Sequence, residues 1–298
     1  MWKLSWPPHT RPYKENSMIA ICPNPFRDHE LKLTKELDAM LRSDGFETWI
    51  CPVFADEEPE VLPEDLVYHP LKAIDESCTL AVVVGGDGTI LAVVRALQGM
   101  TVPLLGINLG TKGFMTALEP ENAALVVKAA RGERQLSHRM MLDVSLRRNG
   151  EIVYTDHALN DAVLHGYGDC IQMTASCNGA VMTSFSGDGI ILATPTGSTG
   201  YSMSAGGPIV EPDAANIILS PICAHRMVSR SFVLDPQRTV VVKTEKLHGR
   251  RAYLSVDGSS VADLENGDEL LVKRSQHETL MVDMGLKSFY EMAFEKLI

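Results

Sequence analysis

The 298-residue chain lacks long apolar runs and is poor in positive charge. No stretch approaches the length of about 18 consecutive apolar residues that predicts a membrane span. Its 27 Lys and Arg stand against 38 Asp and Glu, which gives a formal net charge of −11. Because nucleic-acid binders depend on clustered Lys and Arg, we expect neither a membrane span nor a nucleic-acid partner.

The chain also lacks the cysteine spacings of metal sites and disulfide frameworks. Its six cysteines include no Cys-x-x-Cys pair and no Cys/His metal spacing. This pattern favours buried free thiols in a reducing compartment, and we expect a cytoplasmic protein. The cysteines are Cys22, Cys51, Cys78, Cys170, Cys177 and Cys223.

The most informative stretch is AVVVGGDGT, residues 81–89. A short run of β-branched residues predicts a strand that is buried on both faces. Gly85, Gly86 and Gly88 then surround the carboxylate of Asp87. Glycines let a phosphate or a ribose lie directly against the main chain, at the strand ends where open α/β sheets bind ligands. A plain tight turn is the alternative interpretation.

Two kinds of periodicity divide the chain. Up to residue 136, apolar strands (18–22, 46–53, 80–84 and 102–108) alternate with helical segments (30–42, 90–97 and 119–130). This order predicts a parallel sheet with helices on both faces. Farther on, Asn149-Gly150 and Asn178-Gly179 indicate hairpin turns between alternating strands. We therefore predict an α/β domain over 18–136 and a β-rich, sandwich-like antiparallel domain over 137–277, followed by a final helix over 289–298.

A second stretch rich in glycine and hydroxyl groups covers residues 188–210 and contains TPTGSTGYS at 194–202. Together with GGDGT, it closely resembles the NAD kinase family from Met18 onward. GGDGT alone also occurs in diacylglycerol and sphingosine kinases. The resemblance implies a Rossmann-like N-terminal domain, a β-sandwich-like domain, and a C-terminal segment (278–298) that returns to the first domain.

The resemblance implies that ATP phosphorylates the adenosine ribose 2′-hydroxyl of NAD, with Mg²⁺ carried mainly by the nucleotide. The reaction needs an oriented alcohol, a base, and charge placed on the phosphoryl group. The family uses the aspartate of this motif on the hydroxyl, so Asp87 is the candidate base. An Asx-type turn is the alternative role for Asp87. The implied ATP- and phosphate-binding residues are Gly85, Gly86, Gly88 and Thr89.

The resemblance also implies an NAD-binding set drawn from several segments. Asn160 and Asp161 would contact the adenosine, although Asn-Asp could equally form a turn. Asp188 would meet the ribose or amide on the nicotinamide side, and Tyr201 would lie near the adenosine. The TPTGSTGYS stretch could instead be a helix start used for packing, with Thr199 as the cap. The implied set is Gly86, Asp87, Gly88, Phe114, Asn160, Asp161, Asp188, Thr199, Gly200, Tyr201 and Ser204.

Several questions stay open at this level. His225 could contact a phosphate or ribose or be purely structural, whereas a hairpin turn accounts for Asp257-Gly258. A lipid kinase of the same superfamily and a non-catalytic NAD(P)-binding regulator are the rival functions. Expected partners are NAD, ATP or polyphosphate, and further copies of the chain in a homodimer or homotetramer. The sequence shows no dedicated cation cage.

Residues 1–17 have no periodic apolar face, and their three prolines (Pro7, Pro8 and Pro12) disfavour regular structure. A chain that begins at Met18 should therefore keep the melting temperature and activity of the full chain. Thermal unfolding and an activity assay on both proteins test this. Loss of either property on truncation would show that the tail packs on the folded body or on a neighbouring subunit.

Overall fold

The computed structural model describes residues 18–54, 61–97, 99–110, 113–225, 230–245 and 247–297. They form two compact units, the first within Met1–His138 and Thr279–Ile298 and the second Arg139–Glu278. The predicted tail, residues 1–17, lies outside the described residues. No helix in the described part of the chain is long and apolar enough to span a bilayer.

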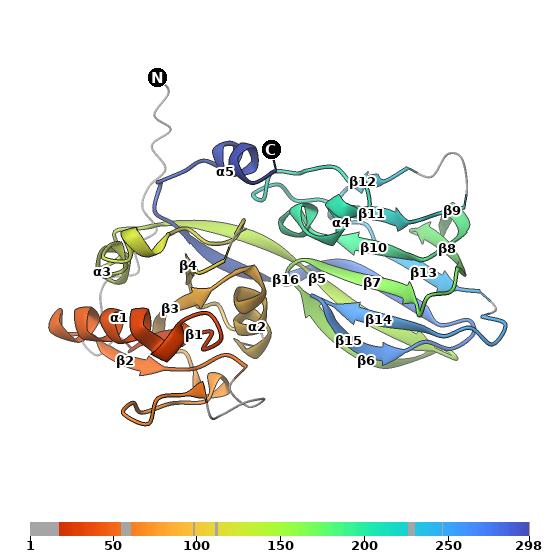
Figure 1. The fold of residues 1–298 in the computed structure, drawn as a ribbon. Helices are drawn as coiled ribbons and strands as arrows, with labels where there is room; N and C mark the ends of the chain where they lie inside the picture. The colour runs from red at the N-terminus through yellow and green to blue at the C-terminus, as the bar shows by residue number, and fades with distance from the viewer. Residues whose placement is uncertain are drawn as a thin grey trace, which may run out of the picture. The chain divides into compact units, whose positions relative to one another are not determined.

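The first unit is built on a parallel sheet in the order β2-β1-β3-β4 (Figure 1). Met281, near the end of the long strand β16, pairs with Leu104 of β4 and so extends the sheet. The strands are β1 (Met18–Pro23), β2 (Glu47–Ile50), β3 (Cys78–Gly85), β4 (Leu104–Asn108) and β16 (Glu269–Asp283). The helices are η1 (His29–Leu31), α1 (Lys32–Ser43), η3 (Leu71–Ala73), α2 (Asp87–Leu97), η4 (Pro120–Asn122), α3 (Leu125–Ala130) and α5 (Phe289–Leu297).

Helices cover both faces of this sheet. Leu37 of α1 and Val126 of α3 share a buried cluster with Ile107 of β4. Side chains alternate along a strand, so Gly106 faces the opposite side. There a Cβ on Gly106 would lie 2.9 Å from Ile90 Cδ1 of α2. The parallel α/β architecture predicted from the sequence is therefore confirmed.

The first helix begins later than its apolar periodicity predicts. Residue 30 was the predicted start, but α1 begins at Lys32, and Glu30 and Leu31 have positive φ angles of 55° and 50°. The carboxylate of Asp28 accepts the N–H groups of Leu33 and Thr34 at 3.0 and 2.9 Å. These bonds satisfy donors of the first turn, so Asp28 sets where the helix begins.

The second unit is formed by strands of two antiparallel sheets. One has the order β12-β11-β10-β7-β14-β15; the other contains β16-β13-β8-β9, with β5 between β16 and β6. The strands are β5 (Gln135–Arg148), β6 (Glu151–Ala158), β7 (Asp161–Gly166), β8 (Ile171–Cys177), β9 (Ala180–Gly187), β10 (Gly189–Ala193), β11 (Ile217–Ile222), β12 (Phe232–Leu234), β13 (Val240–Thr244), β14 (Ala252–Val256) and β15 (Ser259–Asp263). The short helices η5 (Thr196–Thr199) and α4 (Tyr201–Ser204) follow β10.

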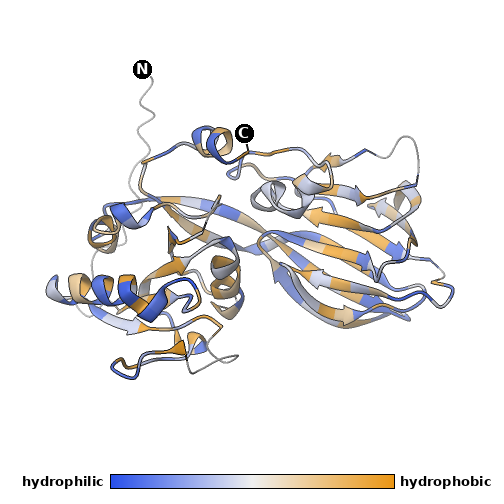
Figure 2. Cartoon of the chain, viewed as in Figure 1, coloured by the Kyte–Doolittle hydropathy of each residue, from blue (hydrophilic) through white to orange (hydrophobic). Residues whose placement is uncertain are grey.

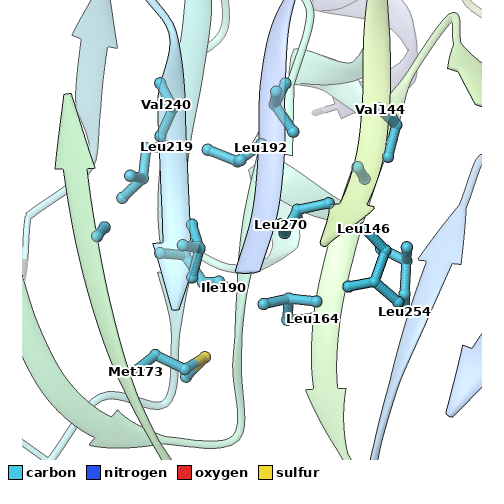
Figure 3. Packing of buried hydrophobic residues seen from close by; sticks show 14 of the residues in the cluster. Val144, Leu146, Leu164, Met173, Ile190, Leu192, Leu219, Val240, Leu254 and Leu270 are labelled. Carbon is cyan, nitrogen blue, oxygen red and sulfur yellow. The ribbon is translucent and has the colours of Figure 1, made fainter. Parts of the chain in front are cut away.

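Apolar side chains from both sheets meet in one buried core (Figure 3). Leu164 and Leu254 come from one sheet, and Val240 and Leu270 come from the other. Figure 2 shows hydrophobic segments along these strands. This packing confirms the sandwich-like fold predicted for the β-rich part.

The predicted hairpin turns also have the expected geometry. Asn149 and Gly150 have φ angles of 52° and 89°, and Asn178 and Gly179 have φ angles of 48° and 84°. Two successive positive φ angles define the turn that matches the natural twist of paired strands. These turns join β5 to β6 and β8 to β9, as predicted.

Candidate active site

Asp87 is the first residue of α2, directly after the buried strand β3. Its two carboxylate oxygens accept separate backbone N–H groups from the loop after β4. Phe114 N–H donates to Oδ2 at 3.0 Å, and Met115 N–H donates to Oδ1 at 3.1 Å. The carboxylate is therefore fixed by a neighbouring loop, and its bonds are not those of an Asx turn.

Burial raises the pKa of Asp87 above its ordinary value. The N–H groups of Phe114 and Met115 and the ammonium of Lys296 act in the opposite direction, because each favours the charged form. The balance leaves the pKa raised, which makes the carboxylate a better proton acceptor than a free aspartate.

The glycines around Asp87 have different surroundings. A Cβ on Gly85 would lie 2.4 Å from Thr89 Oγ1, whereas no heavy atom lies within 4 Å of the Cβ position on Gly86 or Gly88. Thr89 is itself buried, and its hydroxyl accepts Asn24 Nδ2–H at 3.3 Å. Gly85 and Thr89 thus pack closely against each other within the loop, while Gly86 and Gly88 leave room for a ligand.

A pocket of about 320 Å³ opens beside this loop. Arg27 brings a positive charge to it, and neither Arg27 nor Asn24 was predicted from the sequence. The sequence signal that could have indicated them is Asn24-Pro25, which follows Pro23 at the end of β1, at the same edge of the parallel sheet. The pocket is lined by Asn24, Arg27, Phe54, Gly86, Asp87, Gly88, Thr89 and Gly110.

In the second unit, Asn160 and Asp161 are held by Asp257, for which the sequence predicts only a hairpin turn. The carboxylate of Asp257 accepts the N–H groups of Leu159, Asn160 and Asp161 at 2.8, 2.7 and 3.0 Å. Asp257 also lies in the expected hairpin turn, with a φ angle of 46°. The turn prediction was correct, but it missed this supporting role.

Asp161 and Asp257 form a buried acidic pair. Burial first, and the charge of Asp257 second, raise the pKa of Asp161 to about 7. Burial also raises the pKa of Asp257, but its three N–H donors favour the charged form. Asp257 is therefore the member that keeps its charge, and Asp161 is the member that binds a proton near neutral pH.

The TPTGSTGYS stretch packs directly against Asn160. A Cβ on Gly197 would lie 2.2 Å from Asn160 O, so only glycine fits there. Thr194 donates its hydroxyl to Leu159 O at 2.6 Å. Within the described residues, Asn160 Oδ1 and Thr196 Oγ1 are buried and have no hydrogen-bond partner. Buried polar atoms without a partner are unusual and are candidates for contacts with water or a ligand.

The alternative role of Thr199 as a helix cap is not observed. Gly200 occupies the N-cap position of α4 and makes no side-chain bond, and Thr199 Oγ1 instead donates to Thr196 O at 3.3 Å. The reason is that Thr199 still belongs to η5, so its hydroxyl bonds within that turn. Tyr201 is 41% exposed, and Ser204 is exposed at the end of α4.

Asp188 lies beside Cys170, which in turn contacts His225, the residue whose role the sequence left open. Cys170 Sγ is 3.6 Å from Asp188 Oδ1 and 3.4 Å from His225 Nε2. The expectation that all six cysteines are buried is corrected here. Cys22, Cys51 and Cys78 are buried, whereas Cys170 and Cys177 are half-buried and Cys223 is exposed. All six are free thiols.

The predicted site residues divide between the two units. Asp87, its glycines, Thr89 and Phe114 lie in the first unit. Within the described residues, no group of three or more His, Cys, Asp or Glu side chains is placed to hold a metal ion. The second unit holds Asn160, Asp161, Asp188, Thr199, Gly200, Tyr201 and Ser204.

Comparison with known proteins agrees with this geometry in both units. A family model of the ATP-NAD kinase N-terminal domain matches residues 28–131, and one of the ATP-NAD kinase C-terminal domain matches residues 159–284. The NAD kinase of Acetivibrio thermocellus is 34% identical over 286 residues, covering 94% of this chain and 96% of that protein. The chain belongs to the NAD kinase family. The NAD kinase of Geobacter metallireducens is 37% identical over 227 residues, covering 75% of this chain and 80% of that protein.

Solved structures of NAD kinases share the fold. Yeast NADH kinase complexed with NADH gives a TM-score of 0.81 at 27% identity, over 95% of this chain and 88% of the yeast chain. An NAD kinase from Archaeoglobus fulgidus in complex with ATP gives a TM-score of 0.72 at 26% identity, over 94% of this chain and 98% of the archaeal chain.

The pKa of Asp161 generates a prediction about stability. Its folded-state pKa of about 7 exceeds the value of about 3.9 for a free aspartate, so the folded state binds more protons between these pH values. The contribution of Asp161 to the free energy of unfolding therefore falls as the pH rises from about 4 to about 7. Asp161→Asn should raise the melting temperature at pH 8 relative to the native chain, and the gain should disappear near pH 4.

Thermal unfolding at several pH values measures this effect. Glu211→Gln, which removes an exposed carboxyl group from the same unit, is the control and should leave the pH dependence unchanged. A constant melting-temperature difference between Asp161→Asn and the native chain across this range would contradict the assignment.

Proposed function

We propose that this chain phosphorylates the adenosine 2′-hydroxyl of NAD with ATP, yielding NADP. The observation that carries the proposal is the Asp87 carboxylate, which borders a pocket and is fixed by the N–H groups of Phe114 and Met115. Membership of the NAD kinase family supports the choice of substrates. The solved relatives, one complexed with NADH and one with ATP, support it further.

Asp87 is the proposed general base. Each of its oxygens uses one acceptor position on the backbone and keeps another, which can accept the ribose hydroxyl. As the 2′-oxygen bonds to the γ-phosphorus of ATP, the bond to ADP breaks and the hydroxyl proton passes to Asp87. The raised pKa of Asp87 favours this last step.

The proposed donor side is the pocket beside α2. Gly86 and Gly88 let the phosphates approach the main chain, and Arg27 supplies positive charge. Gly85 and Thr89 support the loop by packing closely against each other. Mg²⁺ would arrive on the phosphates of ATP, because it retains waters and takes few protein ligands. When bound, it neutralises charge on the transferred phosphoryl group.

The proposed NAD contacts include a set of residues in the second unit. Asn160 and Asp161 would contact the adenosine, and the Asp257 carboxylate holds their backbone in place. Asp188 would meet the nicotinamide-side ribose or amide, and Tyr201 would lie near the adenosine. Phe114, Thr199, Gly200 and Ser204 complete the proposed contacts.

The rival functions receive less support. A lipid kinase is not favoured, because the matched family models for both halves of the chain are those of ATP-NAD kinases. A non-catalytic regulator would bind NAD without phosphorylating it, but it has no use for a fixed carboxylate with a raised pKa. An assay that pairs NAD or NADH with ATP or polyphosphate separates these functions. A cytoplasmic location and a homodimer or homotetramer are proposed from the family resemblance.

Asp87→Asn removes the proton acceptor and keeps the size of the side chain. Loss of a general base costs ~10²–10⁴-fold in rate, so kcat should fall by this order while NAD binds nearly normally by calorimetry. Asp65→Asn, which removes an exposed carboxylate from the same unit, is the matched control. If Asp87→Asn keeps the native kcat, Asp87 is not the base.

Asn160→Ala should affect binding more than chemistry. It removes a contact proposed to exist in both the ground and transition states, so it should chiefly raise KM. One hydrogen bond is worth ~0.5–1.5 kcal/mol, which corresponds to roughly a 2- to 12-fold change. Steady-state kinetics in NAD measure the effect. A large fall in kcat with an unchanged KM would contradict the binding role of Asn160.

A further inference from the structure

The C-terminal helix α5 places a cation on the loop that holds Asp87. Lys296 Nζ donates a hydrogen bond to Gly113 O and lies 5.9 Å from the centre of the Phe114 ring. The carbonyl of Gly113 and the N–H of Phe114 belong to one peptide group. That same N–H donates to Asp87 Oδ2 at 3.0 Å. A single peptide group therefore links the ammonium to the catalytic carboxylate.

This arrangement has an electrostatic consequence. A cation at a carbonyl oxygen polarises the peptide group, and hydrogen bonds that share a polarised group strengthen one another. The N–H of Phe114 becomes a better donor to Asp87. The bond also fixes the orientation of the peptide plane, and thus the direction in which this N–H points.

The surroundings of Gly113 limit how the loop can adjust. A Cβ on Gly113 would lie 2.4 Å from Thr116 Oγ1 and 3.1 Å from Asn108 Oδ1. Gly113 and Thr116 are both buried. The peptide group is therefore packed on its inner side, and Lys296 contacts it through its carbonyl oxygen.

Helix α5 contributes little to the core. None of its described residues is buried, and Tyr290 and Phe294 are 66% and 68% exposed. The helix start is held locally, because Ser288 Oγ donates to Glu291 Oε2 at 2.7 Å. The Lys296 side chain contacts the loop of Gly113 and Phe114. Packing of the apolar core thus gives no reason for Lys296 to be where it is.

We propose that Lys296 is a positioning residue for phosphoryl transfer: its ammonium orients and polarises the Gly113–Phe114 peptide group, which in turn holds Asp87 as the base. The inference rests on the proposed function, since it assigns the purpose of the contact from the role of Asp87. It assigns to one side chain of the C-terminal helix a role in positioning the proposed base.

The proposal predicts the direction of a pH effect. Among the described residues, the charged groups near Asp87 include Lys296 on α5, which acts on its carboxylate, and Arg27, which lines the same pocket. Lys296 lowers the pKa of Asp87, so removing its charge should raise that pKa. The acid limb of kcat/KM should then move to higher pH.

Lys296→Met tests the proposal, because methionine keeps the apolar stem and removes the charge. Loss of one charge-assisted hydrogen bond should lower kcat by roughly 10-fold, with the KM for NAD little changed. Lys296→Arg keeps the charge and donors and should recover much of the loss. Lys287→Met is the control, since Lys287 pairs with Glu295 on the surface of the same segment and should leave kcat unchanged.

A second measurement does not depend on activity. Titration of the Asp87 carboxyl carbon by NMR should show a higher pKa in Lys296→Met than in the native chain. If the native chain fails to phosphorylate NAD, the proposed function is wrong, while this titration still tests the link between Lys296 and Asp87. Unchanged kcat and unchanged Asp87 titration in Lys296→Met would overturn the inference. A loss of kcat with an unmoved acid limb, or without recovery in Lys296→Arg, would also overturn it.

Discussion

The arrangement of the first unit depends on two hydrogen bonds, from the N–H groups of Phe114 and Met115 to the carboxylate of Asp87. They join the start of α2 to the loop after β4, so two neighbouring strand ends share one carboxylate. Burying a charged carboxylate without such partners costs free energy, and the carboxylate would bind a proton instead. Here burial raises the pKa while the donors preserve the charged form. The result is a fixed, basic carboxylate beside a pocket.

In the second unit, too, a carboxylate accepts backbone N–H groups, but it has a different role. The carboxylate of Asp257 accepts three successive N–H groups, from Leu159 to Asp161, and so fixes the start of β7. Burial first, and the neighbouring charge of Asp257 second, raise the pKa of Asp161 to about 7. The fixed carboxylate of Asp87 is itself the proposed base, whereas Asp257 supports its neighbours.

Much of the fold could be predicted from the sequence, because its signals are local. The β-branched run before Gly85 and the Asn-Gly turns indicate their own conformations. The bonds of Asp257 could not be predicted, since they join residues 96 to 98 positions apart and a hairpin turn already accounts for Asp-Gly. Arg27 was missed for a similar reason. It follows β1, and the order of the parallel strands places β1 beside β3, whose loop borders the pocket. Thr199 shows a limit of local patterns. Its hydroxyl suits a helix cap, but in the structure it donates to Thr196 O within η5.

The central claim is that Asp87 accepts the proton of the adenosine 2′-hydroxyl, and a crystal structure of the native chain with NAD tests it most directly. The account predicts the 2′-oxygen of the adenosine ribose within about 2.6–3.2 Å of an Asp87 carboxylate oxygen, the reach of a general base. It also predicts that the bonds from Phe114 and Met115 to Asp87 persist in the complex. A 2′-hydroxyl held by another side chain, with Asp87 out of hydrogen-bond reach, would contradict it.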